Sequence, residues 1–127
     1  MFLVYSIVTS ILLSVNITSS VPYSTIEKAF ESNNAKEITA LGKTKILVNI
    51  LGKESAYSQS QASLVLQDFL TKHPCSSFAF IFKGKESDDG TFAIGNYTSK
   101  SEKYRVTIYF KKEQSAFKIE SLTIEKD

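Results

Sequence analysis

The sequence contains few of the residues from which small proteins build cross-links or metal sites. Its 127 residues include one Cys, one His and no Trp. A single Cys cannot form an intramolecular disulfide, and no Cys or His spacing matches a metal site. We therefore expect no metal and no cofactor, and a fold held together by its apolar core.

Acidic and basic residues are absent from the first 26 positions. Residues 2–15 form an apolar run broken only by small hydroxyl residues, which is typical of a secretory leader except that no Lys or Arg precedes it. A membrane-spanning helix needs roughly 20 apolar residues, so a permanent anchor is the weaker interpretation. We expect a signal peptide at residues 1–20, cleaved before Val21, and a periplasmic or secreted protein. A buried N-terminal strand or helix is the alternative.

The rest of the chain, residues 21–127, is long enough for one domain with one core. Lys and Arg number 15 and Asp and Glu number 13, which gives a net charge of +2. Nucleic-acid-binding domains usually have a strongly basic face. Nucleic acid is therefore not an expected partner, and no membrane span is expected once the leader is removed.

Two capping signals predict a pair of short helices at the start of this domain. Ser24 with Glu27 forms a capping box ahead of apolar residues at helical spacing. Asn34 with Glu37 predicts a second helix, which we expect to end at Gly42 in a left-handed turn.

A strand and a long helix are predicted next. Residues 46–51 are apolar and rich in β-branched side chains, and Gly52 follows them. A third capping box begins at Ser58, and apolar residues then recur at the i, i+3, i+4, i+7, i+8 positions of a helix. The step His73-Pro74 is expected to end this helix.

Four runs of alternating apolar and polar residues occupy the last part of the chain and predict an antiparallel meander with one buried face. The alternation reverses at Ser121, which predicts a β-bulge. Together the elements give an α+β fold of order α-α-β-α-β-β-β-β. The residues expected on the buried face are Phe78, Phe80, Phe82, Phe92, Ile94, Asn96, Tyr104, Val106, Ile108, Phe110, Phe117 and Ile119.

This order resembles the nuclear transport factor 2-like fold, also called cystatin-like, a cone in which a curved antiparallel sheet wraps around helices. Residues 27–38 are similar to the opening helix pair of that superfamily. The chain is also similar to an exported bacterial family without established activity, domain of unknown function 4783, through Ile50-Leu51-Gly52-Lys53-Glu54, Tyr57-Ser58, Phe92-Ala93-Ile94-Gly95 and Tyr104-Arg105-Val106. The superfamily resemblance implies either an isomerase or dehydratase pocket with Asp, His and Tyr or a non-catalytic binding role.

None of the reactive side chains lies in a pattern that predicts catalysis. His73 is expected to cap the last carbonyl groups of its helix, and Asp68 falls on the outer side of the same helix. Cys75 has no base placed beside it. The run Asp88-Asp89-Gly90 lacks the further oxygen ligands of a calcium site and is interpreted as a hairpin turn.

Two functions from different classes remain. The first is a non-catalytic binding or interaction module of the bacterial cell envelope, favoured because no acid–base pair is predicted to face inward. The second is a small-molecule pocket enzyme of the isomerase or dehydratase kind, which a carboxylate or imidazole bonded to Asn96 or Tyr104 would favour. The residues expected to line any pocket are Phe30, Phe80, Phe92, Asn96 and Tyr104.

The outward positions of the meander are more apolar and aromatic than a solvated face requires. Ile81, Tyr97 and Tyr109 are among them. We expect a homodimer through this face, which the superfamily resemblance also implies. A small apolar ligand or another envelope protein is the remaining expected partner.

Overall fold

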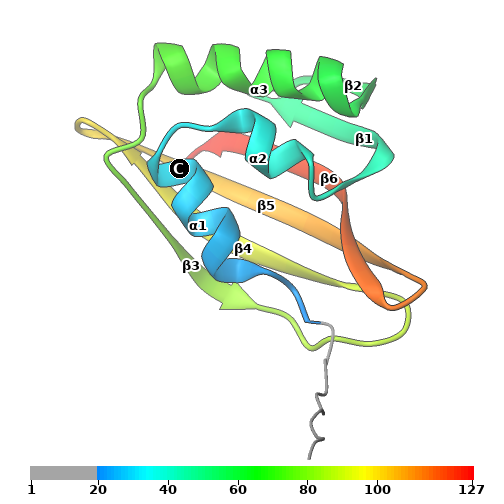
Figure 1. Ribbon diagram of the computed structural model, residues 1–127. Coiled ribbons are helices and arrows are strands. Elements are labelled where there is room, and N and C mark those ends of the chain that lie inside the picture. The colour runs from blue at the N-terminus through cyan, green and yellow to red at the C-terminus, as the bar shows by residue number, and fades with distance from the viewer. Residues whose placement is uncertain (1–19) are drawn as a thin grey trace, which may run out of the picture.

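The computed structural model describes residues 20–127, in which three helices pack against one face of a curved, open sheet (Figure 1). The helices are α1 (Tyr23–Glu31), α2 (Ala35–Thr39) and α3 (Gln59–Lys72). The strands are β1 (Gly42–Ile50), β2 (Lys53–Ser58), β3 (Ser77–Lys83), β4 (Thr91–Ser99), β5 (Glu102–Glu113) and β6 (Ala116–Lys126). The predicted α+β class is confirmed.

The six strands form one sheet in the order β2-β1-β6-β5-β4-β3. Strands β3 to β6 are the predicted antiparallel meander. Strand β1 adds to the free edge of this meander by pairing with β6, to which it runs parallel. The sequence did not predict β2, which pairs with β1 as a hairpin through a tight turn at Leu51 and Gly52.

Two of the three predicted helix caps are present. The Asn34 side chain accepts a hydrogen bond from the Glu37 amide at 3.1 Å, and the Ser58 hydroxyl accepts one from the Gln61 amide at 3.3 Å. Each bond satisfies an amide that has no partner within the first turn of its helix. His73 follows the last residue of α3, as expected.

The predicted capping box at Ser24 is wrong. Helix α1 begins two residues earlier than this box predicts, at Tyr23 after Pro22, and no side chain caps it. A proline at the start of a helix already has the required φ angle and loses no amide bond there. The Glu27 carboxylate, expected to complete the box, instead accepts from the Phe80 amide of β3 at 3.3 Å.

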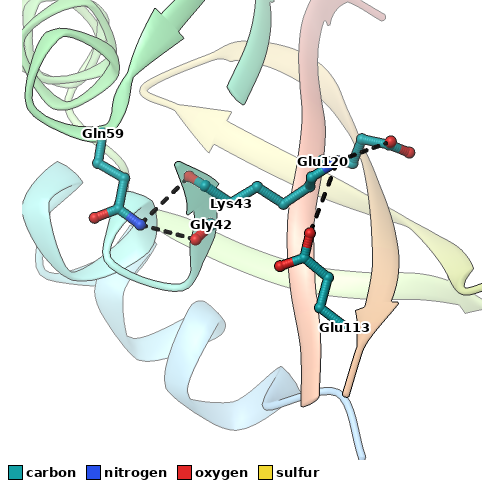
Figure 2. A network of polar contacts seen from close by, with 5 residues as sticks. All are labelled: Gly42, Lys43, Gln59, Glu113 and Glu120. Atoms are coloured by element: carbon teal, nitrogen blue, oxygen red, sulfur yellow. Dashed lines mark hydrogen bonds and ion pairs between the residues drawn. The ribbon is translucent and has the colours of Figure 1, made fainter. Parts of the chain in front are cut away.

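Gly42 begins β1 and does not end a helix in a left-handed turn, so that expectation is also wrong. Its carbonyl accepts a 2.8 Å hydrogen bond from the Gln59 side-chain amide at the start of α3 (Figure 2). Beside it, the Lys43 ammonium lies 3.5 Å from Glu120 and 4.0 Å from Glu113. These contacts join the start of α3 to the far ends of β5 and β6.

Besides a register shift between β1 and β6, the sheet contains two single-residue bulges. Tyr109 pairs with Ser121 and Phe110 with Ile119, which leaves Glu120 unpaired and confirms the bulge predicted beside Ser121. A second bulge in β3, at Ile81, was not predicted. An extra residue reverses the alternation of side chains along a strand.

The predicted orientation of β4 is wrong. Ala93, Gly95 and Tyr97 face the helices and are buried, whereas Phe92 and Asn96 face outward. The positions predicted to face inward on this strand therefore face outward, namely Phe92, Ile94 and Asn96, while Ala93 and Tyr97 face inward. Phe82 also faces outward, because it follows the bulge in β3.

The reason for this orientation is the ring of Phe78. A Cβ atom on Gly95 would collide with the Phe78 ring, which lies over it. The Phe30 ring of α1 stacks on Phe78 in turn, with centroids 4.4 Å apart and planes at 17°. A large side chain at position 95 would leave no room for this stack.

We expect Gly95→Ala to destabilise the domain by about 1–3 kcal/mol, because the added methyl group overpacks the core against Phe78. Chemical denaturation followed by circular dichroism measures this change. The control is Asn96→Ala on the outer face of the same strand, expected to change stability by less than about 0.5 kcal/mol. Equal effects of the two substitutions would contradict the assigned orientation.

Candidate functional site

The interior of the cone is filled by side chains. Phe30 is fully buried in the core, and Phe80 is half-buried with its ring 5.0 Å from that of Tyr23. A space between α2, α3 and the sheet measures about 10 Å³ and is lined by apolar side chains such as Leu66, together with Thr39. That volume holds at most one water molecule. Phe30, one of the residues expected to line a pocket, is therefore part of the packed core.

A polar junction forms where α3 ends against the sheet. The Tyr104 hydroxyl lies 2.7 Å from Glu102 Oε1 and 3.1 Å from His73 Nδ1. Glu102 also pairs with the Lys126 ammonium at 3.3 Å. The Tyr97 hydroxyl donates to the His73 carbonyl. The His73 ring thus contacts a tyrosine of β5 and does not cap the helix carbonyls, which corrects the sequence-based expectation.

The charges of this junction set the direction of its hydrogen bonds. Burial, and then the Glu102 carboxylate, raise the pKa of Tyr104 to about 12, so the phenol keeps its proton. The pKa of Glu102 is lowered, first by the Tyr104 hydroxyl and then by Lys126. Tyr104 therefore donates to ionised Glu102, and its oxygen is left to accept from His73. The imidazole then carries its proton on Nδ1 and leaves Nε2 as an acceptor.

An open groove of about 250 Å³ adjoins this junction, between α3 and the β1–β2 hairpin seen at the top of Figure 1. His73 and Phe69 belong to both, and the Phe69 ring lies edge-on to Tyr104 with centroids 5.2 Å apart. The groove is lined by Ile50, Leu51, Tyr57, Val65 and Phe69, with Lys53, Asp68, Lys72 and His73 as its polar residues.

The other reactive groups have structural surroundings. Burial, and then Glu31, raise the pKa of the Cys75 thiol to about 11, which keeps it in the weakly nucleophilic protonated form. Asp68 is exposed and pairs with Lys72 at 3.1 Å. Gly90 forms the predicted turn, with a positive φ of 126°. Within residues 20–127, no three His, Cys, Asp or Glu side chains gather closely enough to hold a metal ion.

The outer face of the sheet carries a row of three aromatic rings, which we call the aromatic row: Phe82, Phe92 and Tyr109. The ring centroids are 5.3 Å apart at both steps. Phe82 is 47% exposed and Tyr109 is 49% exposed, with Ile81 beside them at 58%. Tyr97, expected on this face, is completely buried on the other side.

Sequence reasoning placed Tyr104 correctly on the inner face of β5 but overlooked Glu102. A signal was available, since residues two apart on a strand lie on the same side of the sheet. Glu102 begins its strand among exposed charged residues, which obscures this signal in the sequence. The contact between Tyr104 and His73 had no such signal, because it joins residues from separate elements.

The domain with this architecture matches a known protein family. The family model described as "Domain of unknown function (DUF4783)" matches residues 23–125. The chain belongs to the DUF4783 family. No curated protein matches it.

Solved structures show the same fold. A DUF4783 family protein from Bacteroides ovatus ATCC 8483 is 25% identical, with a TM-score of 0.77 over 84% of this chain and 96% of that one. A protein from Nostoc punctiforme PCC 73102, described as a domain of unknown function with a cystatin-like fold, is 11% identical with a TM-score of 0.65, covering 82% and 72%. An NTF-2 like protein of unknown function from Silicibacter pomeroyi DSS-3 is 9% identical with a TM-score of 0.59, covering 82% and 88%.

These matches confirm the family and the nuclear transport factor 2-like, or cystatin-like, fold expected from the sequence. They attach no activity to the DUF4783 domain. In residues 20–127, none of the helices is long and apolar enough to cross a membrane.

For this DUF4783 domain we expect Tyr97→Phe to destabilise the fold by about 1–3 kcal/mol, because the His73 carbonyl at the end of α3 loses its buried donor. Thermal and chemical denaturation measure the change. The matched control is Tyr109→Phe, whose hydroxyl lies on the exposed face and whose loss should change stability by less than about 0.5 kcal/mol. An unchanged free energy of unfolding in Tyr97→Phe would contradict this role of the Tyr97 hydroxyl.

Proposed function

We propose that this domain is a non-catalytic binding module that acts outside the cytoplasm and associates with a second copy of itself through the outer face of its sheet. The observation that carries the proposal is the aromatic row. Rings in contact with one another on an uncovered face present a continuous apolar surface, and such surfaces mark interaction sites. Tyrosine and phenylalanine are also enriched at the centres of interfaces.

A second copy fits this face because the face is self-complementary in character. The outward residues that flank the row on one side, on β5 and β6, are uncharged and include Thr107, Ser121 and Thr123, whereas Lys111 follows Tyr109 on its other side. Two copies related by a two-fold axis would place the same apolar strip on both sides without burying a charge. Exposed Lys and Arg side chains such as Arg105 and Lys111 continue the outer face of β5 on either side of the strip and would form a polar rim.

The alternative, a pocket enzyme of the isomerase or dehydratase kind, has one observation in its favour. Tyr104 lies within hydrogen-bond reach of both an imidazole and a carboxylate. Three features weigh against it. The space inside the described core is too small for a substrate, and Asn96 faces outward. The Tyr104 hydroxyl is already hydrogen-bonded to Glu102 and His73 within the protein. We therefore favour the binding module.

We expect the wild-type domain to sediment as a dimer and the double variant Phe82→Lys, Tyr109→Lys to sediment as a folded monomer, because four lysines would face one another across the interface. Sedimentation velocity over a range of concentrations makes the measurement. Leu64→Lys is the control, because Leu64 is 73% exposed on α3, away from the sheet. A wild type that stays monomeric at high concentration would refute self-association.

A contact at Val21 supports removal of the leader. Its side chain is buried in the core, and its backbone nitrogen lies 3.4 Å from a Glu86 carboxylate oxygen. Cleavage before Val21 would turn that nitrogen into an ammonium group beside an opposite charge. The new end of the chain would then be anchored by both burial and charge. Residues 1–19 of the expected leader, which spans residues 1–20, lie outside the described residues.

We expect protein recovered from the periplasm or the culture medium to have the mass of residues 21–127. Intact-mass spectrometry measures this directly. A mass that includes Met1 would refute cleavage. Glu86→Gln should leave the cleavage site unchanged but lower the stability of the mature form, since only the charge on the partner is removed.

A further inference from the structure

We propose that the groove between α3 and the β1–β2 hairpin is a binding site for a small alcohol or phenol with an apolar body, whose hydroxyl group donates to Nε2 of His73. The site is separate from the outer sheet face and does not depend on self-association. Apolar side chains line more of the groove than polar ones, and the His73 imidazole at the end of α3 is among its polar groups.

The polarity of the site follows from the junction behind it. Nδ1 of His73 faces the Tyr104 hydroxyl at 3.1 Å, and that hydroxyl donates to Glu102 at 2.7 Å. His73 must then donate from Nδ1, and Nε2 remains as a lone-pair acceptor. Nε2 makes no hydrogen bond to any residue in the described part of the chain. A neutral acceptor beside apolar side chains selects a ligand with a hydrogen-bond donor, and a hydroxyl group is the donor we propose.

The hairpin turn supplies a second, independent observation. Leu51 has a left-handed backbone with φ 53° and is followed by Gly52 with φ 93°. Turns of this kind favour Asn at the first position, and a bulky residue with positive φ is uncommon. Yet a leucine stands there, 48% exposed, and forms one wall of the groove. Lys100 and Gln114 have a similar positive φ in the β4–β5 and β5–β6 turns, so what distinguishes Leu51 is its exposed apolar side chain on the groove wall.

The charges on the rim favour a hydroxyl over a carboxylate ligand. Lys72 is paired with Asp68 at 3.1 Å, so its charge is balanced. Lys53 is exposed on the hairpin, where water screens its attraction. A carboxylate placed at Nε2 would meet a lone pair, not a proton. The volume of about 250 Å³ also limits the ligand to about one ring with a short tail, since common ligand pockets start at about 300 Å³.

The first test reads the proton directly. The chain has one histidine, so its two ring nitrogens give unambiguous signals in long-range 1H–15N NMR spectra. We expect the spectra of the wild type to show the proton on Nδ1. Glu102→Ala, at an exposed position, frees the Tyr104 hydroxyl to donate to His73 and should move the proton to Nε2. A wild type with the proton on Nε2 overturns the proposal.

The second test measures binding with 4-propylphenol as the probe and propylbenzene and hexanoate as comparisons. The phenol should bind and shift the Nε2 signal, and should bind about tenfold more tightly than propylbenzene, the worth of one hydrogen bond. Glu102→Ala should remove most of that difference. Equal binding of phenol and propylbenzene, tighter binding of hexanoate, or no binding of the phenol each overturns the proposal.

A variant of the turn separates the ligand role of Leu51 from a structural one. Leu51→Asn restores the preferred turn residue, so the melting temperature should stay the same or rise. Loss of the leucine wall should nevertheless weaken 4-propylphenol binding about fivefold or more. Leu64→Asn, an exposed leucine outside the groove, should leave binding unchanged. Full retention of affinity in Leu51→Asn would overturn this use of the hairpin.

Discussion

The contact of Gly95 with the ring of Phe78 determines how the rest of this domain is arranged. Because position 95 has no side chain, the Phe78 ring lies directly over β4 and the Phe30 ring of α1 stacks on it. That stack fixes α1 against the sheet and fills the interior. It also fixes which side of β4 faces the core, since neighbouring positions alternate. Phe92 and Ile94 are thereby placed on the outer face, where Phe92 joins the aromatic row, while Tyr97 is buried on the inner face.

The filled interior moves the open space to the margin of the fold. In a cone of this kind a pocket between sheet and helices is the expected place for a ligand, but here aromatic rings occupy it. The remaining groove lies outside the core, where α3 ends beside the β1–β2 hairpin. His73 connects the two regions, because its carbonyl binds Tyr97 of the core and its ring lines the groove. One residue therefore links the packing of the domain to the chemistry of its surface.

The two surfaces have different characters. The aromatic row is broad, uncharged and lies on strands β3 to β5, as suits contact with another protein surface. The groove is small, with apolar walls and several polar groups that include the His73 imidazole, as suits a small molecule. Membership of the DUF4783 family does not choose between them, because the fold supports both kinds of use. The assignment rests on the side chains, which differ between the two places.

The sequence by itself determined the elements whose signals are local: the caps at Asn34 and Ser58, the amphipathic helix α3, the meander and the bulge beside Ser121. It also placed Tyr104 inward, because β5 alternates without interruption. The tertiary structure decided what depends on volume and on distant partners. Both faces of β4 carry apolar residues, so the alternation alone does not show which face is buried. The Phe78 ring decides it, because it fits over β4 only where Gly95 has no side chain. The bulge at Ile81 and the bond from Tyr104 to His73 were equally out of reach, because each arises only when separate elements pack together.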